Sequence, residues 1–239
     1  MDLTCEERPS DSPFVERIWR DAAGDRQPIN FISIAEHHWS MVVTKFQGQT
    51  ILTVRGPETQ ATPAHDPGGA EHFGIMFKLG AFMPHLPVSR VMDRQDVKLP
   101  GANSQKFWLQ GAAWEFPDFE NADTFVERLV RDDLLVQEPV VNTTLQGAVP
   151  DVSLRSVQRR VLQSTGLSHM SLYQIERARF ATTRLKQGVP ILDVVDEAGY
   201  ADQPHLTRAL KRYTGQTPAQ IISASRPNPL SFLFKTEPF

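Results

Sequence analysis

The chain has 239 residues, 40% of them hydrophobic and 22% charged, and its net charge is −3. This length predicts two domains, and the composition is typical of a globular protein with enough apolar residues for two cores. No apolar run approaches the length of a membrane span, and the first residues, MDLTCEERPSDSP, lack the apolar centre of a signal peptide. We therefore expect a cytoplasmic protein without a membrane partner. The single cysteine, Cys5, excludes an intrachain disulfide and a zinc site built from several cysteines.

The charges are distributed unevenly along the chain. Residues 1–150 carry 13 Lys and Arg against 21 Asp and Glu, whereas residues 151–239 carry 12 against 7. The second part is therefore basic, as a surface that binds phosphate groups must be. The acidic first part would limit non-specific binding to DNA.

The first part of the chain is predicted to be rich in β-strands. It opens with a short helical candidate, PFVERIWR, whose four apolar residues share one side. From Ile29 onward β-branched residues are frequent, and NFISIA, HWSMVVTKF and QTILTVRG are predicted as strands. A loop, TPAHDPGGAE, follows. The strict alternation of apolar residues in HFGIMFKLG then predicts a half-buried strand.

Residues 80–105 contain three prolines and are predicted to form loops with short extended pieces. An apolar run, KFWLQGAAWEFP, precedes a helix predicted from about Asp123 to Asp133, because its apolar residues recur at helical spacing. The first part is thus mixed. It is predicted to contain a curled β-sheet or small barrel and at least one packing helix.

Residues 138–166 predict a first helix-turn-helix unit. The segment EPVVNTTLQGAVPD offers one short helix, and SLRSVQRRVLQSTG offers a second. Ser153 is the N-cap candidate of the second helix, and Gly166 ends it, because glycine accepts the left-handed conformation that follows a helix.

A long helix is predicted next, in SHMSLYQIERARFATTRLKQ, and is ended by Gly188 with Pro190 two residues later. Roughly 18 residues at about 1.5 Å each span about 27 Å, close to the ~34 Å of one DNA turn. A rigid helix of this length can hold two helix-turn-helix units over successive major grooves on one face of the DNA.

Residues Ile191–Ala219 predict a second helix-turn-helix unit. Apolar residues at i, i+3, i+4 and i+7 from Ile191 form the buried stripe of its first helix, which Gly199 ends. Asp202 is suited to cap the next helix, and Pro204 falls in its first turn, where a missing N–H costs nothing. This next helix is predicted to enter the DNA major groove.

The two predicted units match each other at an offset of 49 residues. SLRSVQRRVLQSTGLS then falls on DQPHLTRALKRYTGQT, so that Arg159 matches Arg208 and Gly166 matches Gly215. This internal match indicates two copies of one unit, independently of any relative.

Each unit presents side chains that suit DNA on the outer face of its second helix. Arginine can donate two hydrogen bonds to guanine, and glutamine can pair similarly with adenine. Lys211, Arg212 and Arg160 are the candidates for phosphate contacts. The residues predicted to bind DNA are Arg155, Ser156, Gln158, Arg159, Gln203, His205, Thr207, Arg208, Lys211 and Arg212.

The run DVVDEAGYADQPHLTRALKRYTGQTPAQ resembles the C-terminal signature of AraC-type (AraC/XylS family) transcriptional regulators over nearly its whole length. The resemblance implies two helix-turn-helix units on a central helix and double-stranded DNA as the partner. Members of this family typically activate transcription through contact with RNA polymerase. The segments VRGPET, GAFMPHLP, KFWLQGAAWEFP and NADTFVERL resemble the N-terminal domains of a subset of these regulators. Such domains are commonly cupin-like and sense a small-molecule effector or form a homodimer.

The chain departs from the family pattern in its first unit. Where a full second helix is usual, it has GAVPDV, and Pro150 would interrupt a helix by removing an N–H and clashing one turn back. We therefore expect the first unit to seat its recognition helix less firmly than the second.

These observations predict an α+β protein with three segments. Residues 1–137 form a β-rich, cupin-like or small-barrel domain for sensing or dimerisation, residues 138–225 form an all-α AraC-type DNA-binding domain, and residues 226–239 form a tail. The predicted function is sequence-specific transcriptional regulation, with activation in response to a small-molecule effector. The sequence does not identify the effector-binding residues, because the aromatic residues of a pocket and of a core have the same pattern.

Five histidines raise an alternative, a cupin-like metal-dependent enzyme with a helical appendage; they are His37, His38, His65, His72 and His85. A cupin metal site usually takes two ligands from an HxH pair on one strand face, and this sequence has no such pair. Adjacent His37 and His38 would point to opposite faces of a strand. We therefore predict no catalytic residue, metal or cofactor. A third possibility is an interaction protein whose helices do not bind DNA.

Overall fold

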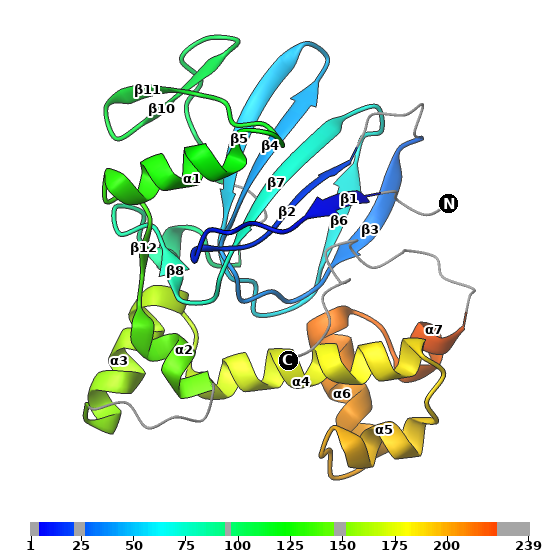
Figure 1. Cartoon of the computed structure of the whole chain (residues 1–239). Coiled ribbons are helices and arrows are strands. Elements are labelled where there is room, and N and C mark those ends of the chain that lie inside the picture. The colour runs from blue at the N-terminus through cyan, green and yellow to red at the C-terminus, as the bar shows by residue number, and fades with distance from the viewer. Residues whose placement is uncertain (1–4, 22–26, 94–96, 146–151, 224–239) are drawn as a thin grey trace. The chain divides into compact units, whose positions relative to one another are not determined.

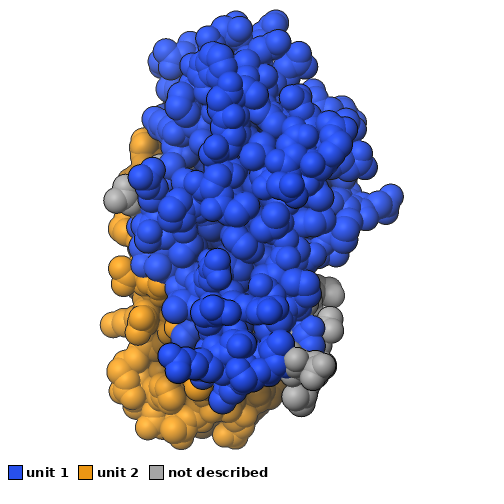
Figure 2. All heavy atoms as spheres, turned by 90° about the vertical axis from the view of Figure 1, so that its left-hand side faces the viewer, with its two compact units in different colours: residues 1–27, 37–57, 67–168 blue, residues 28–36, 58–66, 169–239 orange. Residues whose placement is uncertain are grey.

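The computed structural model describes residues 5–21, 27–93, 97–145 and 152–223. The chain groups into two compact units (Figure 2). The first contains residues 1–27, 37–57 and 67–168, and the second contains residues 28–36, 58–66 and 169–239. The predicted α+β fold is confirmed, because the described strands all lie before residue 138 and the described helices follow, apart from one α-helix and one short 3₁₀ helix. No helix of the described segments is both long and apolar enough to cross a membrane.

The elements of the first unit appear in Figure 1. Its strands are β1 (Cys5–Arg8), β2 (Val15–Asp21), β4 (Ser40–Phe46), β5 (Gln49–Arg55), β7 (Glu71–Phe77), β8 (Ala81–Phe82), β9 (Val97–Lys98), β10 (Lys106–Leu109), β11 (Ala112–Glu115) and β12 (Val136–Gln137). Its helices are the 3₁₀ helix η1 (Val88–Arg90), α1 (Ala122–Arg131), α2 (Pro139–Leu145) and α3 (Leu154–Thr165). The second unit contains β3 (Ile29–Ser33), β6 (Thr62–Asp66), α4 (His169–Lys186), α5 (Ile191–Glu197), α6 (Gln203–Thr214) and α7 (Pro218–Ile222).

A six-stranded antiparallel sheet organises the first unit, with the strand order β1-β2-β7-β4-β5-β9. Strand β7 was predicted to be half-buried, but all four residues from Gly74 to Phe77 are buried. The reason is close packing on both faces. A Cβ atom on Gly74 would lie 2.2 Å from Cε2 of Trp19, so only glycine lets this ring cross the strand.

The segment PFVERIWR contains most of β2, so the predicted short helix is wrong. The pairing of β2 with β7 has an irregular register between Val15 and Arg17. Because a bulge breaks the alternation of a strand, Val15 and Ile18 both reach the core although they are three residues apart. That spacing is the one that a helix would give.

The segment TPAHDPGGAE was predicted to be a loop and contains β6, which pairs with β3 as a two-stranded antiparallel ribbon. Pro63 lies within β6. Proline is tolerated in a strand that has a free edge, because its missing N–H need not serve a second neighbour.

The predicted helix near residue 123 is confirmed as α1, which packs on the hairpin of β10 and β11 in the same core cluster as the sheet. The ring of Trp114 meets that of Phe125 edge to face, with 5.9 Å between the ring centroids. Arg128, also on α1, makes a cation–π contact with the same ring. Its guanidinium carbon lies 3.9 Å from the Trp114 centroid.

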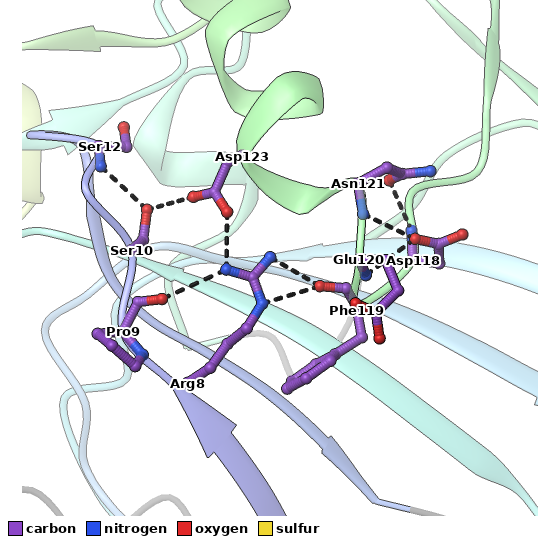
Figure 3. A network of polar contacts seen from close by, with 9 residues as sticks. All are labelled: Arg8, Pro9, Ser10, Ser12, Asp118, Phe119, Glu120, Asn121 and Asp123. Carbon is purple, nitrogen blue, oxygen red and sulfur yellow. Dashed lines mark hydrogen bonds and ion pairs between the residues drawn. The ribbon is translucent and has the colours of Figure 1, made fainter.

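Arg8 ties the end of β1 to the first turn of α1 (Figure 3). Its guanidinium donates hydrogen bonds to the Phe119 carbonyl at 2.9 and 2.7 Å and to Asp123 at 2.7 Å. The Ser10 hydroxyl donates to the other oxygen of the same carboxylate. Burial alone would raise the pKa of Asp123, but the hydrogen bonds from Ser10 and Arg8 outweigh it and hold this pKa below its usual value.

We predict that Asp123→Asn lowers the melting temperature by a few degrees at pH 7, because Arg8 and Ser10 lose a charged acceptor. The folded-state pKa of Asp123 is depressed, so its contribution is present above the unfolded value near 4 and is lost as the pH falls through the lower folded value. The difference between the variant and the parent should therefore shrink below about pH 4. Circular dichroism melts across this range test the prediction. Glu120→Gln, which affects only an exposed ion pair, is the control, and a difference that does not change with pH would contradict the assignment.

Candidate nucleic-acid interface

The first helix-turn-helix unit contains α2 and α3, and the helix ends predicted for α3 are confirmed. The Ser153 side chain accepts a hydrogen bond from the Ser156 amide at 3.3 Å, and Gly166 has a left-handed φ of 70°. Val157 and Val161 are buried on the inner face of α3. Pro150, which was expected to weaken this unit, lies outside the described residues.

The second helix-turn-helix unit contains α5 and α6, and it packs with α4 and α7 around one apolar core. Asp202 caps α6 by accepting a hydrogen bond from the His205 amide at 2.7 Å, and Gly215 ends the helix with φ of 71°. Leu206 and Leu210 are fully buried on the inner face. The predicted caps and the predicted buried stripe are therefore confirmed.

The repeat at an offset of 49 residues is present in the geometry of the two predicted recognition helices, α3 and α6. Each has 12 residues, a side-chain N-cap and a left-handed C-terminal glycine. The buried hydroxyls of Thr165 and Thr214 each donate to the carbonyl four residues earlier, both at 2.7 Å. Equivalent residues thus make equivalent hydrogen bonds.

Arg177 of α4 holds the turn that joins α5 to α6. Its guanidinium donates to the carbonyls of Ala198, at 2.7 Å, and of Gly199, and it lies 3.8 Å from the centroid of Tyr200. Burial raises the pKa of Tyr200 to about 12, so this phenol stays neutral at physiological pH. The ring of His205 packs edge-on against Tyr200, with centroids 5.1 Å apart. His205, predicted to bind DNA, therefore also supports the turn.

The predicted DNA-binding residues mostly lie on the solvent-facing sides of α3 and α6. The exposed members are Arg155, Gln158, Arg159, Gln203, Arg208, Lys211 and Arg212, and the half-buried members are Ser156, His205 and Thr207. The Ser156 hydroxyl accepts a hydrogen bond from Ser153 within the N-cap. Arg160 was expected to contact phosphate. Its guanidinium lies 3.5 Å from the Glu138 carboxylate and forms an ion pair inside the first helix-turn-helix unit.

Two leucines that the sequence reasoning missed belong to the outer face of α3. Leu154 is 73% exposed and Leu162 is 53% exposed. Arg155, Arg159 and Leu162 follow one helical stripe, since they are four and then three residues apart. The repeat contains the signal for the outward position of Leu162, because Leu162 is equivalent to Lys211 at the offset of 49 residues and Lys211 was predicted to face outward.

The five histidines do not gather into one cluster among the described residues. His65 is hydrogen-bonded to Asn30 and His72 to Thr44. His37 and His38 are buried, and their rings lie 4.0 Å apart rather than on opposite faces of a strand, because the chain bends there. The prediction that this pair would point apart is therefore wrong.

A cavity of about 690 Å³ lies beside Arg8, Ser10, Asp123 and Glu127 in the first unit. One of its carboxylates, Asp123, is already bound by Arg8 and Ser10. Effector-binding residues are therefore not assigned to this cavity.

A comparison with protein families matches the region that runs from α3 to α7. A family model described as a helix-turn-helix domain matches residues 149–224. The HTH-type transcriptional regulator RipA of Corynebacterium glutamicum is 35% identical over 92 residues, which cover 38% of this chain and 28% of that protein. The chain thus spans less than a third of the length of this relative, and no solved structure matches. These matches confirm a helix-turn-helix domain in the region of residues 149–224 and support the resemblance to AraC-type transcriptional regulators noted in the sequence.

Proposed function

We propose that this protein is a sequence-specific DNA-binding transcription regulator whose recognition helices are α3 and α6. The observation that supports the proposal most is the pair of equivalent helices, each capped in the same way and each with cationic side chains exposed on its outer face. Such helices fit the major groove, and their arginine and glutamine side chains suit base edges.

The two outer faces suggest different contributions to binding. On α6, Lys211 and Arg212 follow Arg208 toward the C-terminal end, where they suit phosphate groups. On α3 the equivalent positions hold Leu162 and Gln163, while Arg155, Gln158 and Arg159 remain available for bases. The second helix-turn-helix unit therefore supplies more of the electrostatic attraction to DNA, and the first has fewer side chains that can contact phosphate groups.

We also propose, on the strength of the family resemblance, that the protein is cytoplasmic and activates transcription by contacting RNA polymerase. The same resemblance supports a small-molecule effector and a homodimer as functions of the β-rich first part. A library of promoter fragments bound by the protein in cells, compared with transcript levels after its deletion, tests the direction of control.

We predict that Arg208→Ala costs about 1 to 3 kcal/mol of binding free energy at one base position if its contact is bidentate. Because specificity comes from base contacts, the variant should also tolerate more bases at that position. Duplexes selected from a random pool by the purified protein provide the probes, and fluorescence anisotropy at low salt gives the affinities. Arg159→Ala should have a smaller effect, because the first unit has fewer phosphate ligands to hold its helix in the groove.

Unchanged affinity and an unchanged footprint for Arg208→Ala would contradict the role of α6. A larger loss of affinity for Arg159→Ala than for Arg208→Ala would show that the first helix-turn-helix unit contributes more to DNA binding than the second. Arg131→Ala, an exposed position on α1, serves as a matched loss of one positive charge outside the predicted interface.

We predict that Leu162→Lys strengthens binding to all duplexes, because it places on α3 the cation that Lys211 supplies on α6. The slope of log affinity against log salt should become steeper by about 1, the value expected for one additional phosphate contact. Leu162→Ala is the neutral control and should leave the slope unchanged. An unchanged slope for Leu162→Lys would place residue 162 away from the phosphate groups.

A further inference from the structure

The ribbon of β3 and β6 comes from the first part of the chain, yet it belongs to the same compact unit as α4 to α7. We refer to residues 28–36 and 58–66 as the ribbon. The ribbon does not contain any of the residues predicted to bind DNA. Its contacts with α6 and α4 therefore call for a different role.

The ribbon covers the C-terminal end of recognition helix α6. The backbone amides of Ala35 and Ala61 donate hydrogen bonds to the carbonyls of Tyr213 and Arg212, both at 2.8 Å. Carbonyls in the last turn of a helix have no donor within the helix, so these bonds satisfy groups that would otherwise need water. Packing is tight as well, since a Cβ atom on Gly215 would lie 2.9 Å from Cγ2 of Ile32.

A buried ion pair fixes the ribbon to α4. Arg179 donates to Glu36 at 2.8 Å, and their side chains are only 10% and 9% exposed. Glu36 is held in place by two backbone hydrogen bonds with Glu58, at 3.0 and 2.7 Å. Removing one partner of a buried pair leaves the other charge in a poor environment, so such a pair strongly favours one arrangement of the elements that carry it.

Short covalent connections join the ribbon to the sheet of the first unit. Strand β4 begins at Ser40, four residues after Glu36, and β5 ends at Arg55, three residues before Glu58. The segment between Glu36 and β4 also contacts α3. The indole N–H of Trp39 donates a hydrogen bond to the Ser164 carbonyl at 3.2 Å. Ser164 is equivalent to Tyr213 at the offset of 49 residues. Residues 35–39 thus donate a hydrogen bond to the same carbonyl position of both recognition helices.

We propose that the ribbon is a positioning element for α6 and that the Glu36–Arg179 ion pair locks it in place. Through this ion pair, the ribbon controls how well the second helix-turn-helix unit engages DNA. The proposal rests on the proposed function, because it concerns the contribution of α6 to DNA binding.

The test uses the full-length protein with Glu36→Gln, which keeps the shape of the side chain and removes its charge. Three DNA probes are needed: the duplex selected by the parent protein, and two versions in which either half-site is scrambled. The half-site of α6 is the one at which Arg208→Ala relaxes base preference. We expect Glu36→Gln to bind about tenfold more weakly to the duplex that retains only the α6 half-site. Affinity for the duplex that retains only the α3 half-site should be unchanged.

Glu176→Gln is the matched control, because Glu176 also pairs with Arg179, at 3.5 Å, but lies on α4 rather than on the ribbon. It should leave both affinities unchanged. If Glu36→Gln does not fold, Ile32→Ala replaces it, since it removes packing against Gly215 without changing a charge, and the same loss confined to the α6 half-site is expected.

Equal losses on both half-sites would indicate general destabilisation and overturn the proposal, as would the absence of any loss. A loss of the same size for Glu176→Gln would assign the effect to Arg179 alone and would also overturn it. If the parent protein binds no duplex, the proposed function itself fails, which this design distinguishes from failure of the lock.

Discussion

The carbonyl groups in the last turn of a helix have no donor within that helix, and α3 and α6 each meet this constraint with donors from the first part of the chain. Each recognition helix ends at a left-handed glycine, Gly166 or Gly215, and its last turn therefore presents carbonyls to whatever packs beside it. In α3 the donor is the indole of Trp39, and in α6 the donors are the amides of Ala35 and Ala61. Because these donors come from the first part of the chain, the recognition helices are completed by residues far away in the sequence.

The sequence predicts features that local chemistry determines. The caps at Ser153 and Asp202 and the terminal glycines follow from backbone groups within a few residues, so they could be identified without the fold. Strand β2 could not be identified from the sequence, because a bulge gives its apolar residues the spacing of a helix. The ribbon was missed for a related reason: β6 contains Pro63, and its identity as a strand depends on pairing with β3, which is about 30 residues earlier.

In the candidate interface, too, features that depend on nearby residues could be predicted from the sequence, whereas contacts with other elements could not. The outward positions of Arg155, Arg159 and Arg208 follow from helical periodicity and are exposed in the structure. Periodicity does not reveal that Arg160 pairs with Glu138 or that His205 packs against Tyr200, since both partners lie on other elements. The exposed Leu162 is informative for another reason. It breaks the chemical symmetry of two helices whose caps and cores are otherwise equivalent, so the repeat preserves the scaffold more strictly than the surface.

The buried Glu36–Arg179 pair also affects how the chain divides into functional parts. A boundary near residue 138 separates the β-rich region from the helical region along the sequence, but the contacts place residues 28–36 and 58–66 with α4 to α7. A fragment that begins at residue 138 would keep Arg179 and lose Glu36, together with the donors for the carbonyls of Arg212 and Tyr213. Arg179 would then still have Glu176 as an acidic partner, but the two carbonyls would lack their donors, so the end of α6 would have to rearrange or bind water. The second helix-turn-helix unit is therefore complete only when the ribbon is present.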